Sequence, residues 1–269
     1  MLLKNKLLLL SGYFICSVIS ISLYGSDKKT ASEDTKTKEE SAAQNPMGAS
    51  IRDALEKGNI NEVVIYFEKN PQKINNRDKE GKTALEIAAG AIHLGKDQFN
   101  LVKAILNCNP AFGVALLEAV ESNNKMIVDF LLKQGAGKDI NKIIDDQERN
   151  ALMLAKSPTI TAMLLATGID LNARDSEGNT AKMIAEKNSK QEGKTQEEKT
   201  AFEIIKWMLT LQPIMESLEK SRADPEIKDF ESLKKKTIEE LNIPPYIMNY
   251  LLANVEAKEK AEEAEEAEQ

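Results

Sequence analysis

The side chains that could carry out catalysis or hold a metal are few in this chain. It has one histidine, His93, and two cysteines, Cys16 and Cys108. His93 stands alone between Ala91 and Gly95, and no cysteine or second histidine lies at the spacing that a metal site needs. The sequence contains neither a phosphate-binding G-x-x-x-x-G-K-[ST] loop nor a G-x-S-x-G nucleophile elbow. We therefore expect no catalytic residue, no metal site and no cofactor, and the protein is not expected to be an enzyme.

A short sequence motif recurs along the chain and indicates how the chain is organised. Residues 78–85 read Asp-Lys-Glu-Gly-Lys-Thr-Ala-Leu, and residues 175–181 read Asp-Ser-Glu-Gly-Asn-Thr-Ala. Four alanines align with this motif and lie 31, 36 and 30 residues apart: Ala84, Ala115, Ala151 and Ala181. A further copy is indicated upstream, because residues 51–59 parallel residues 117–124. A fixed period of this length is typical of proteins built from repeated structural units.

Each copy also contains one segment with the apolar spacing of a helix. Apolar residues at i, i+3 and i+4 lie on one helical face. The five segments carry Val63, Tyr66 and Phe67; Val102, Ile105 and Leu106; Val128, Leu131 and Leu132; Thr161, Leu164 and Leu165, with one polar exception; and Ile205, Met208 and Leu209. One helix pair cannot bury such a face by itself, so successive pairs are expected to stack into a shared core.

These residues resemble the ankyrin repeat, whose pattern runs D-x-x-G-x-T-P-L-H-x-A-A and closes on G-A-D-V-N-A. The closing pattern is similar to Gly-Ile-Asp-Leu-Asn-Ala at residues 168–173. The resemblance covers about 165 of the 269 residues. It implies an all-α ankyrin-repeat solenoid of about five stacked helix-turn-helix units with short hairpin loops over residues 49–213, followed by a helical cap.

The repeated turn residues have expected roles. Gly81 and Gly178 suit a turn with positive φ, and the aspartates Asp78 and Asp175 can accept hydrogen bonds from nearby backbone. Thr83 and Thr180 stand where a helix N-cap is needed. Asn141 and Asn172 are expected in the hairpins, where asparagine tolerates left-handed backbone.

The copies also depart from the family pattern. The proline and histidine of T-P-L-H are absent, Glu148 replaces the turn glycine of the fourth copy, and the third copy lacks the turn. Insertions enlarge the second copy at residues 90–97 and the fifth copy at residues 187–199.

The resemblance implies a non-catalytic scaffold that binds a protein partner, and we expect a monomer. The expected contacts lie at the hairpin tips and along the face of the first helices. The tip residues are Lys79, Glu80, Gln147, Glu148, Ser176 and Glu177, and the groove residues are Ala91, Glu121, Ser157 and Lys187.

The first 25 residues are interpreted as a secretory signal peptide. Lys4 and Lys6 precede an apolar run from Leu7 to Tyr24, and small residues follow near Gly25. An uncleaved membrane anchor is the alternative, since an 18-residue run is at the lower limit for spanning a bilayer. Residues 26–48 are polar and are expected to be a disordered linker.

Net charge and cysteine content limit which kinds of partner and which cell compartment are expected for the protein. Cleavage would remove Lys4 and Lys6 and leave 34 basic against 43 acidic residues, a net charge of −9 in place of −7. This charge disfavours nucleic acid, whose phosphates require a basic surface. The mature chain would keep only Cys108 and form no internal disulfide; this residue is expected to be buried or half-buried. We expect an exported protein, in the periplasm, the medium or a host, with no membrane contact after cleavage.

The C-terminal part leaves two interpretations open. Residues 214–255 are expected to be helical, with a short helix at residues 214–221 after Pro213 and further helices that start at Asp224-Pro225 and at Pro244-Pro245. Residues 256–269 are expected to be a solvated acidic helix. The plainer interpretation is a cap over the last repeat. Residues 232–251 also resemble a SOCS box, and residues 243–247 the opening of an F-box, which would imply an adaptor that recruits a host ubiquitin ligase. Its contacts would be Leu233, Thr237, Ile243, Pro244, Tyr250 and Leu251.

Overall fold

The computed structural model describes residues 47–112, 114–221, 236, 237, 239–251 and 253. Within this part the regular structure is helical, and β structure is limited to an isolated antiparallel bridge between Ile144 and Asn150. The all-α prediction is therefore confirmed for the described residues. The predicted signal peptide, almost all of the linker and the acidic tail at residues 256–269 lie outside them. Two compact units divide between Ala181 and Lys182, and each is treated separately below.

The first unit consists of α-helices joined by short turns. Its α-helices are α2 (Ala49–Glu56), α3 (Ile60–Lys69), α4 (Ala84–Gly90), α5 (Lys96–Leu106), α6 (Ala115–Glu121), α7 (Lys125–Leu131), α8 (Ala151–Leu154) and α9 (Pro158–Leu165). Three short 3₁₀ segments, Pro71–Lys73, Ile92–Leu94 and Ile140–Lys142, and a π-type turn at Leu132–Ala136 lie between them.

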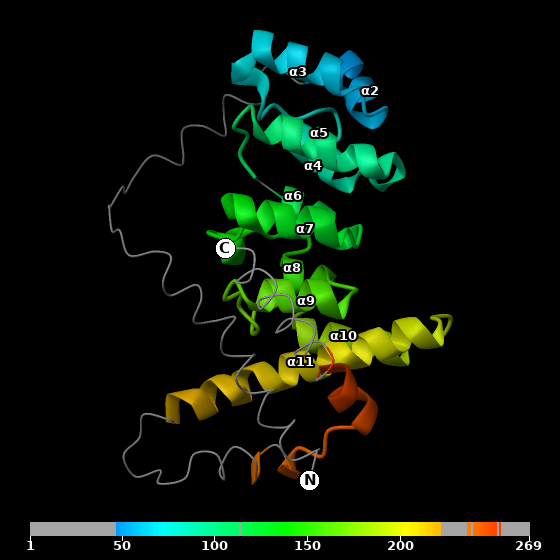
Figure 1. Cartoon of the computed structure of the whole chain (residues 1–269), viewed down its shortest axis with the longest axis vertical. Helices are drawn as coiled ribbons and strands as arrows, with labels where there is room; N and C mark the ends of the chain where they lie inside the picture. The colour runs from blue at the N-terminus through cyan, green and yellow to red at the C-terminus, as the bar shows by residue number, and fades with distance from the viewer. Residues whose placement is uncertain (1–46, 113, 222–235, 238, 252, 254–269) are drawn as a thin grey trace, which may run out of the picture. The chain divides into compact units, whose positions relative to one another are not determined.

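These helices contact one another in a regular order. Each pair packs together: α2 with α3, α4 with α5, α6 with α7, and α8 with α9. Within the unit, the pairs follow one another from α2–α3 to α8–α9 (Figure 1). The first helices of successive pairs touch, from α2 through α4 and α6 to α8, and so do the second helices, from α3 through α5 and α7 to α9.

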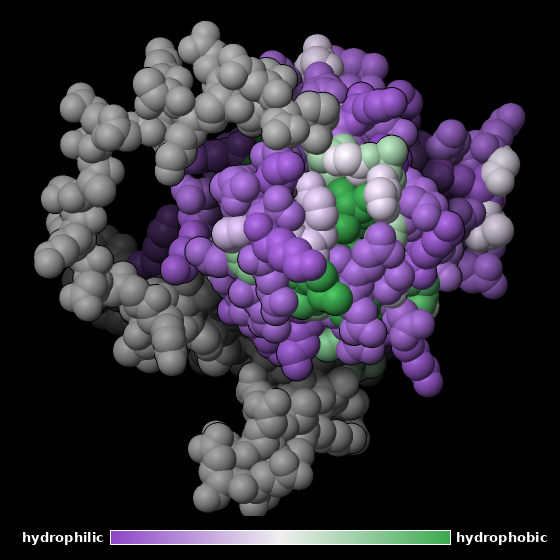
Figure 2. Space-filling model, turned by 90° about the horizontal axis from the view of Figure 1, so that it is seen from above, coloured by the Kyte–Doolittle hydropathy of each residue, from purple (hydrophilic) through white to green (hydrophobic). Residues whose placement is uncertain are grey.

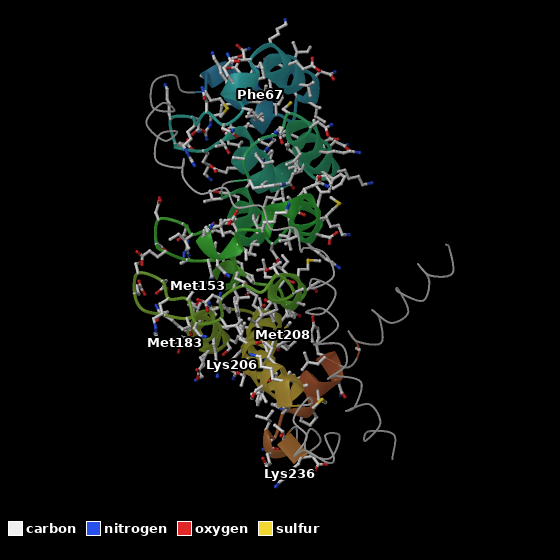
Figure 3. All side chains as sticks on the ribbon, turned by 90° about the vertical axis from the view of Figure 1, so that its left-hand side faces the viewer. Phe67, Met153, Met183, Lys206, Met208 and Lys236 are labelled. Carbon is white, nitrogen blue, oxygen red and sulfur yellow. The ribbon has the colours of Figure 1, made fainter. Side chains whose placement is uncertain are left out.

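The core lies along both rows of helices, as the apolar spacing predicted. Most residues of the predicted faces in the first unit are buried: Val63, Phe67, Val102, Ile105, Val128, Leu131, Thr161, Leu164 and Leu165. Tyr66, Leu106 and Leu132 are half-buried. Thr161 is buried although polar, because its hydroxyl donates to the carbonyl of Ser157 at 3.0 Å. Phe67 on α3 and Met153 on α8 can be found in Figure 3.

Polar side chains cap the N-termini of several helices in this unit. Thr83 forms a capping box with Glu86: its hydroxyl accepts from the Glu86 N–H at 3.3 Å, and the Glu86 carboxylate accepts from the Thr83 N–H at 3.0 Å. The predicted cap at Thr83 is therefore confirmed. Asn150 caps α8, accepting from the Met153 N–H at 3.1 Å. Such caps satisfy N–H groups that have no partner within a helix.

The prediction of left-handed backbone at Asn141 and Asn172 is wrong. The non-glycine residues of the first unit with positive φ are Asn109, Asn123 and Glu148. Asn141 instead acts through its side chain, which accepts from the Asp170 N–H at 2.7 Å and donates to the Gly168 carbonyl at 3.3 Å. It therefore links the loop before α8 to the loop after α9.

One end of the first unit leaves some apolar surface uncovered. Viewed from the α2–α3 end, the surface is mostly hydrophilic and encloses a small apolar area (Figure 2). Ile65, on α3, is half exposed. A terminal helix pair has no further pair to cover its outer face, so apolar surface is expected there.

In the second unit, helix α11 differs from the prediction. Helix α10 spans Ala181–Lys190, and α11 spans Gln196–Ser221 and passes through Pro213. The interpretation of residues 214–221 as a separate short helix is therefore wrong. Proline removes one hydrogen bond of the helix. Pro213 itself is exposed, whereas Leu209, Leu211 and Met215 around it are buried, and this burial offsets the lost bond.

Candidate interaction surface

Three turns with the same hydrogen bonds recur in the first unit, and each is centred on an aspartate. One carboxylate oxygen accepts from the N–H groups of the residues two and four positions later. The bonds run from Glu80 and Lys82 to Asp78 at 2.8 and 2.9 Å, from Gln147 and Arg149 to Asp145 at 2.9 and 2.8 Å, and from Glu177 and Asn179 to Asp175 at 3.0 and 2.7 Å. The roles predicted for Asp78 and Asp175 are thus confirmed, and Asp145 has the same role.

Each turn needs left-handed backbone at its fourth position. Gly81 and Gly178 have φ of 78° and 82°, as predicted. Glu148 adopts a φ of 59° at the same position, although a side chain disfavours this conformation. The turn therefore forms without its glycine, at a cost in backbone energy.

Arginine side chains bond to each of these turns. Arg52, on α2, donates to Asp78 and to Glu80, the latter at 2.7 Å. Its hydrogen bonds with Glu80 and Glu56 raise the pKa of the Arg52 guanidinium. Arg149 binds the Asp145 carboxylate at 2.7 Å, and Arg174 donates to the Gly178 carbonyl at 2.6 Å.

The predicted tip residues are exposed, and two of the tips meet. The set is Lys79, Glu80, Gln147, Glu148, Ser176 and Glu177. The N–H of Ser176 donates to the carbonyl of Gln147 at 2.9 Å, which joins the second turn to the third. Glu80 is the member already engaged in an ion pair, with Arg52. The tips therefore offer exposed side chains, half of them acidic, on hydrogen-bonded backbone.

The four predicted groove residues differ in exposure: one is buried, one is half-buried and two are exposed. Ala91 is only 5% exposed, so its assignment as a partner contact is wrong; it lies between α4 and the 3₁₀ turn of the insertion, where its small side chain is enclosed. Glu121 is exposed, and its carbonyl accepts from Lys156 at 2.8 Å. Ser157 is half-buried at the N-cap of α9. Lys187 is exposed on α10, in the second unit.

Residues of the suggested adaptor segment lie partly in the described region. Residues 245–251 are helical, as the proline pair predicted. Leu251 is buried, Thr237, Ile243, Pro244 and Tyr250 are half-buried, and Leu233 lies outside the described residues. Burial of Leu251 leaves it unavailable as a surface contact in this structure.

The residues first considered for chemistry have structural contacts. The ring Nε2 of His93 lies 2.7 Å from the Glu56 carbonyl oxygen and donates to it. Cys108 is half-buried, as predicted, and burial together with the charge of Glu68 raises the pKa of its thiol above 9.0. The thiolate is therefore scarce at neutral pH.

Two buried polar side chains were not predicted from the sequence. Gln98 and Glu86 are almost fully buried. Glu86 accepts from Arg77 and, at 3.4 Å, from the Val114 N–H at the start of α6. Glu86 stands where the ankyrin pattern that the sequence resembles has histidine, and this departure was the one signal in the sequence.

In the part of the chain that the structure describes, none of the helices combines the length and apolarity needed to cross a bilayer. No model of a known protein family matches this chain, and no curated protein does so either.

Proposed function

We propose that this protein is an ankyrin-repeat scaffold that binds a protein partner and carries out no catalysis. The observation that carries the proposal is the recurrence of the Asp-centred turn, with the same hydrogen bonds at Asp78, Asp145 and Asp175. Repeated helix pairs with such turns give a rigid row of exposed side chains, which suits recognition of another protein. Helices α10 and α11 would form the fifth repeat.

The binding surface in this proposal is formed by the tips and the exposed first-helix residues. Lys79, Glu148 and Glu177 test it best, because they are exposed and form no ion pair within the described part of the chain. The carboxylate of Glu177 accepts one hydrogen bond of 3.2 Å, from Asn179. Combined reversal by Lys79→Glu, Glu148→Lys and Glu177→Lys is expected to weaken partner binding at least about tenfold, since charge complementarity sets specificity.

The experiment begins with affinity capture from the native organism and identification by mass spectrometry. Binding of the purified partner is then measured for the unchanged protein and for the variant with the reversed tip charges. Lys103→Glu with Lys125→Glu is the matched control, because these exposed lysines lie on the second helices α5 and α7. Unchanged binding after tip reversal, or an equal loss in the control, would contradict the proposed surface.

We further propose export through the N-terminal 25 residues. The apolar run after Lys4 and Lys6 supports it. N-terminal sequencing of the protein from its native compartment should begin near Ser26. A full-length chain that stays with the membrane fraction would favour the anchor instead.

A further inference from the structure

Ile144 is a large apolar residue directly before the second Asp-centred turn, and it is 45% exposed. It faces Asn150 in an antiparallel bridge, and the adjacent Asp145 N–H donates to the Arg149 carbonyl at 3.1 Å. In this register Ile144 and Asn150 are not hydrogen-bonded to each other, so the N–H and C=O of Ile144 point away from the hairpin. Among the described residues, neither group has a hydrogen-bond partner.

Each Asp-centred turn, together with the residues that flank it, is called a hairpin below. The hairpins at Asp78 and Asp175 each form a backbone hydrogen bond with another segment of the chain. Arg77 holds the position of Ile144 in the first hairpin, and its carbonyl accepts from the Met47 N–H at 2.9 Å. Met47 is a buried residue just before α2, so the segment before α2 already pairs with the backbone at Arg77, on the outer side of the first hairpin. The third hairpin lies against the second through the bond from Ser176 to Gln147.

The edge at Ile144 lacks such a neighbour because the preceding copy has no Asp-centred turn. The chain passes from α5 to α6 through a short connection at residues 107–114. Within it, the Ala111 N–H donates to the side chain of Asn75 at 2.7 Å. The third copy therefore supplies no hairpin to pair with the hairpin at Asp145, and the N–H and C=O of Ile144 are left unpaired.

We propose that this edge binds an extended segment of the partner protein, which adds as a strand beside Ile144. The inference rests on the proposed scaffold function and names the conformation of its partner. Unpaired N–H and C=O groups on a strand edge are a template for backbone pairing, and an exposed apolar side chain gives the added strand a contact. In the turn after Ile144, Asp146 and Glu148 are exposed, whereas Lys142 before it is paired with Asp139. The segment therefore carries lysine or arginine next to an apolar residue.

Selection of random nonapeptides displayed on phage, with the full chain as bait, tests this inference. Selected peptides should have an apolar residue flanked by basic ones. Ile144→Pro removes the N–H, and Ile143 before it is already extended, as proline requires. It should weaken the selected peptides at least about tenfold, and N-methylation of the peptide amide that pairs with Ile144 should do the same.

Ile144→Lys keeps the backbone and places a charge on the edge, so it decides the matter if the proline variant does not fold. It should also weaken binding about tenfold or more. Met126→Lys is the matched control, because Met126 is 48% exposed but lies on helix α7, which presents no strand edge. This control should bind the peptides like the unchanged chain.

Two results would overturn the inference: failure to select any peptide, or peptides that bind both Ile144 variants as tightly as the unchanged chain. The captured natural partner separates this failure from failure of the scaffold function. A partner that tolerates Ile144→Lys but is lost on tip reversal leaves the scaffold proposal intact and removes the added strand.

Discussion

The side-chain oxygen of Gln98 accepts a hydrogen bond of 2.7 Å from the side-chain amide of Asn124. The amide of Gln98 in turn donates to the carbonyls of Ala88 and Ala89 at 3.0 and 2.8 Å. Asn124 accepts from the Ile127 N–H at 3.2 Å and so caps α7. One buried side chain of α5 therefore satisfies the end of α4 and positions the cap of α7.

Replacing Gln98 with leucine should destabilise the protein by about 2 kcal/mol, because buried carbonyls and the Asn124 amide would lose their partner. Urea unfolding followed by circular dichroism measures the change. Gln72→Leu is the control: Gln72 is exposed, and its replacement should change the unfolding free energy by less than about 0.5 kcal/mol. Equal effects of the two changes would show that the Gln98 bonds contribute nothing specific.

Glu148→Gly should stabilise the protein by about 1 kcal/mol. The φ of 59° disfavours a side chain, and glycine adopts it at little cost. Gly178→Ala makes the reverse change in the next turn and should cost about 1 kcal/mol. Apart from the residues next to it in the chain, no described residue has an atom within 4 Å of a Cβ added at Gly178, so the cost would be one of backbone conformation. Thermal melts of both variants check the pair, and a loss of stability in Glu148→Gly would contradict the argument.

The features that sequence predicted best are local. The positive φ of Gly81, the hydrogen bonds of Asp78 and the cap at Thr83 depend on residues within five positions of one another. The Asp-centred hydrogen bonds recur at Asp78, Asp145 and Asp175. The apolar spacing of the second helices was equally reliable, because a 3.6-residue period fixes which side chains share a face.

The features that sequence did not predict depend on residues far apart. Asn141 bonds to Asp170, and Gln98 to Asn124, across successive copies. The sequence predicts a separate helix after Pro213, yet the burial of Leu211 and Met215 on either side outweighs the local preference of proline. The free edge at Ile144 follows from a hairpin that an earlier copy lacks, so no residue near Ile144 signals it.

Leu131→Ala should lower the unfolding free energy by about 2–5 kcal/mol. Leu131 is fully buried on α7, which packs against α5, α6 and α9, so the substitution opens a cavity in a core shared by successive pairs. Chemical denaturation gives the value. Leu132→Ala should cost less, because that neighbour is only half-buried. An equal cost at both positions would argue against a core centred on Leu131.

Asp175 should make stability depend on pH in the acid range. Partial burial raises its pKa, but hydrogen bonds from Asn179 and Glu177, with the charge of Arg149, outweigh this and lower the pKa below its ordinary value of 3.8. A lowered pKa means that the stabilisation is complete above 3.8 and is lost as the pH falls below it. Asp175→Asn keeps an oxygen acceptor but does not titrate. Between roughly pH 5 and pH 2.5, the melting temperature of the unchanged protein should therefore fall more than that of the variant. Parallel curves for the two proteins would show that the carboxylate charge does not stabilise the turn.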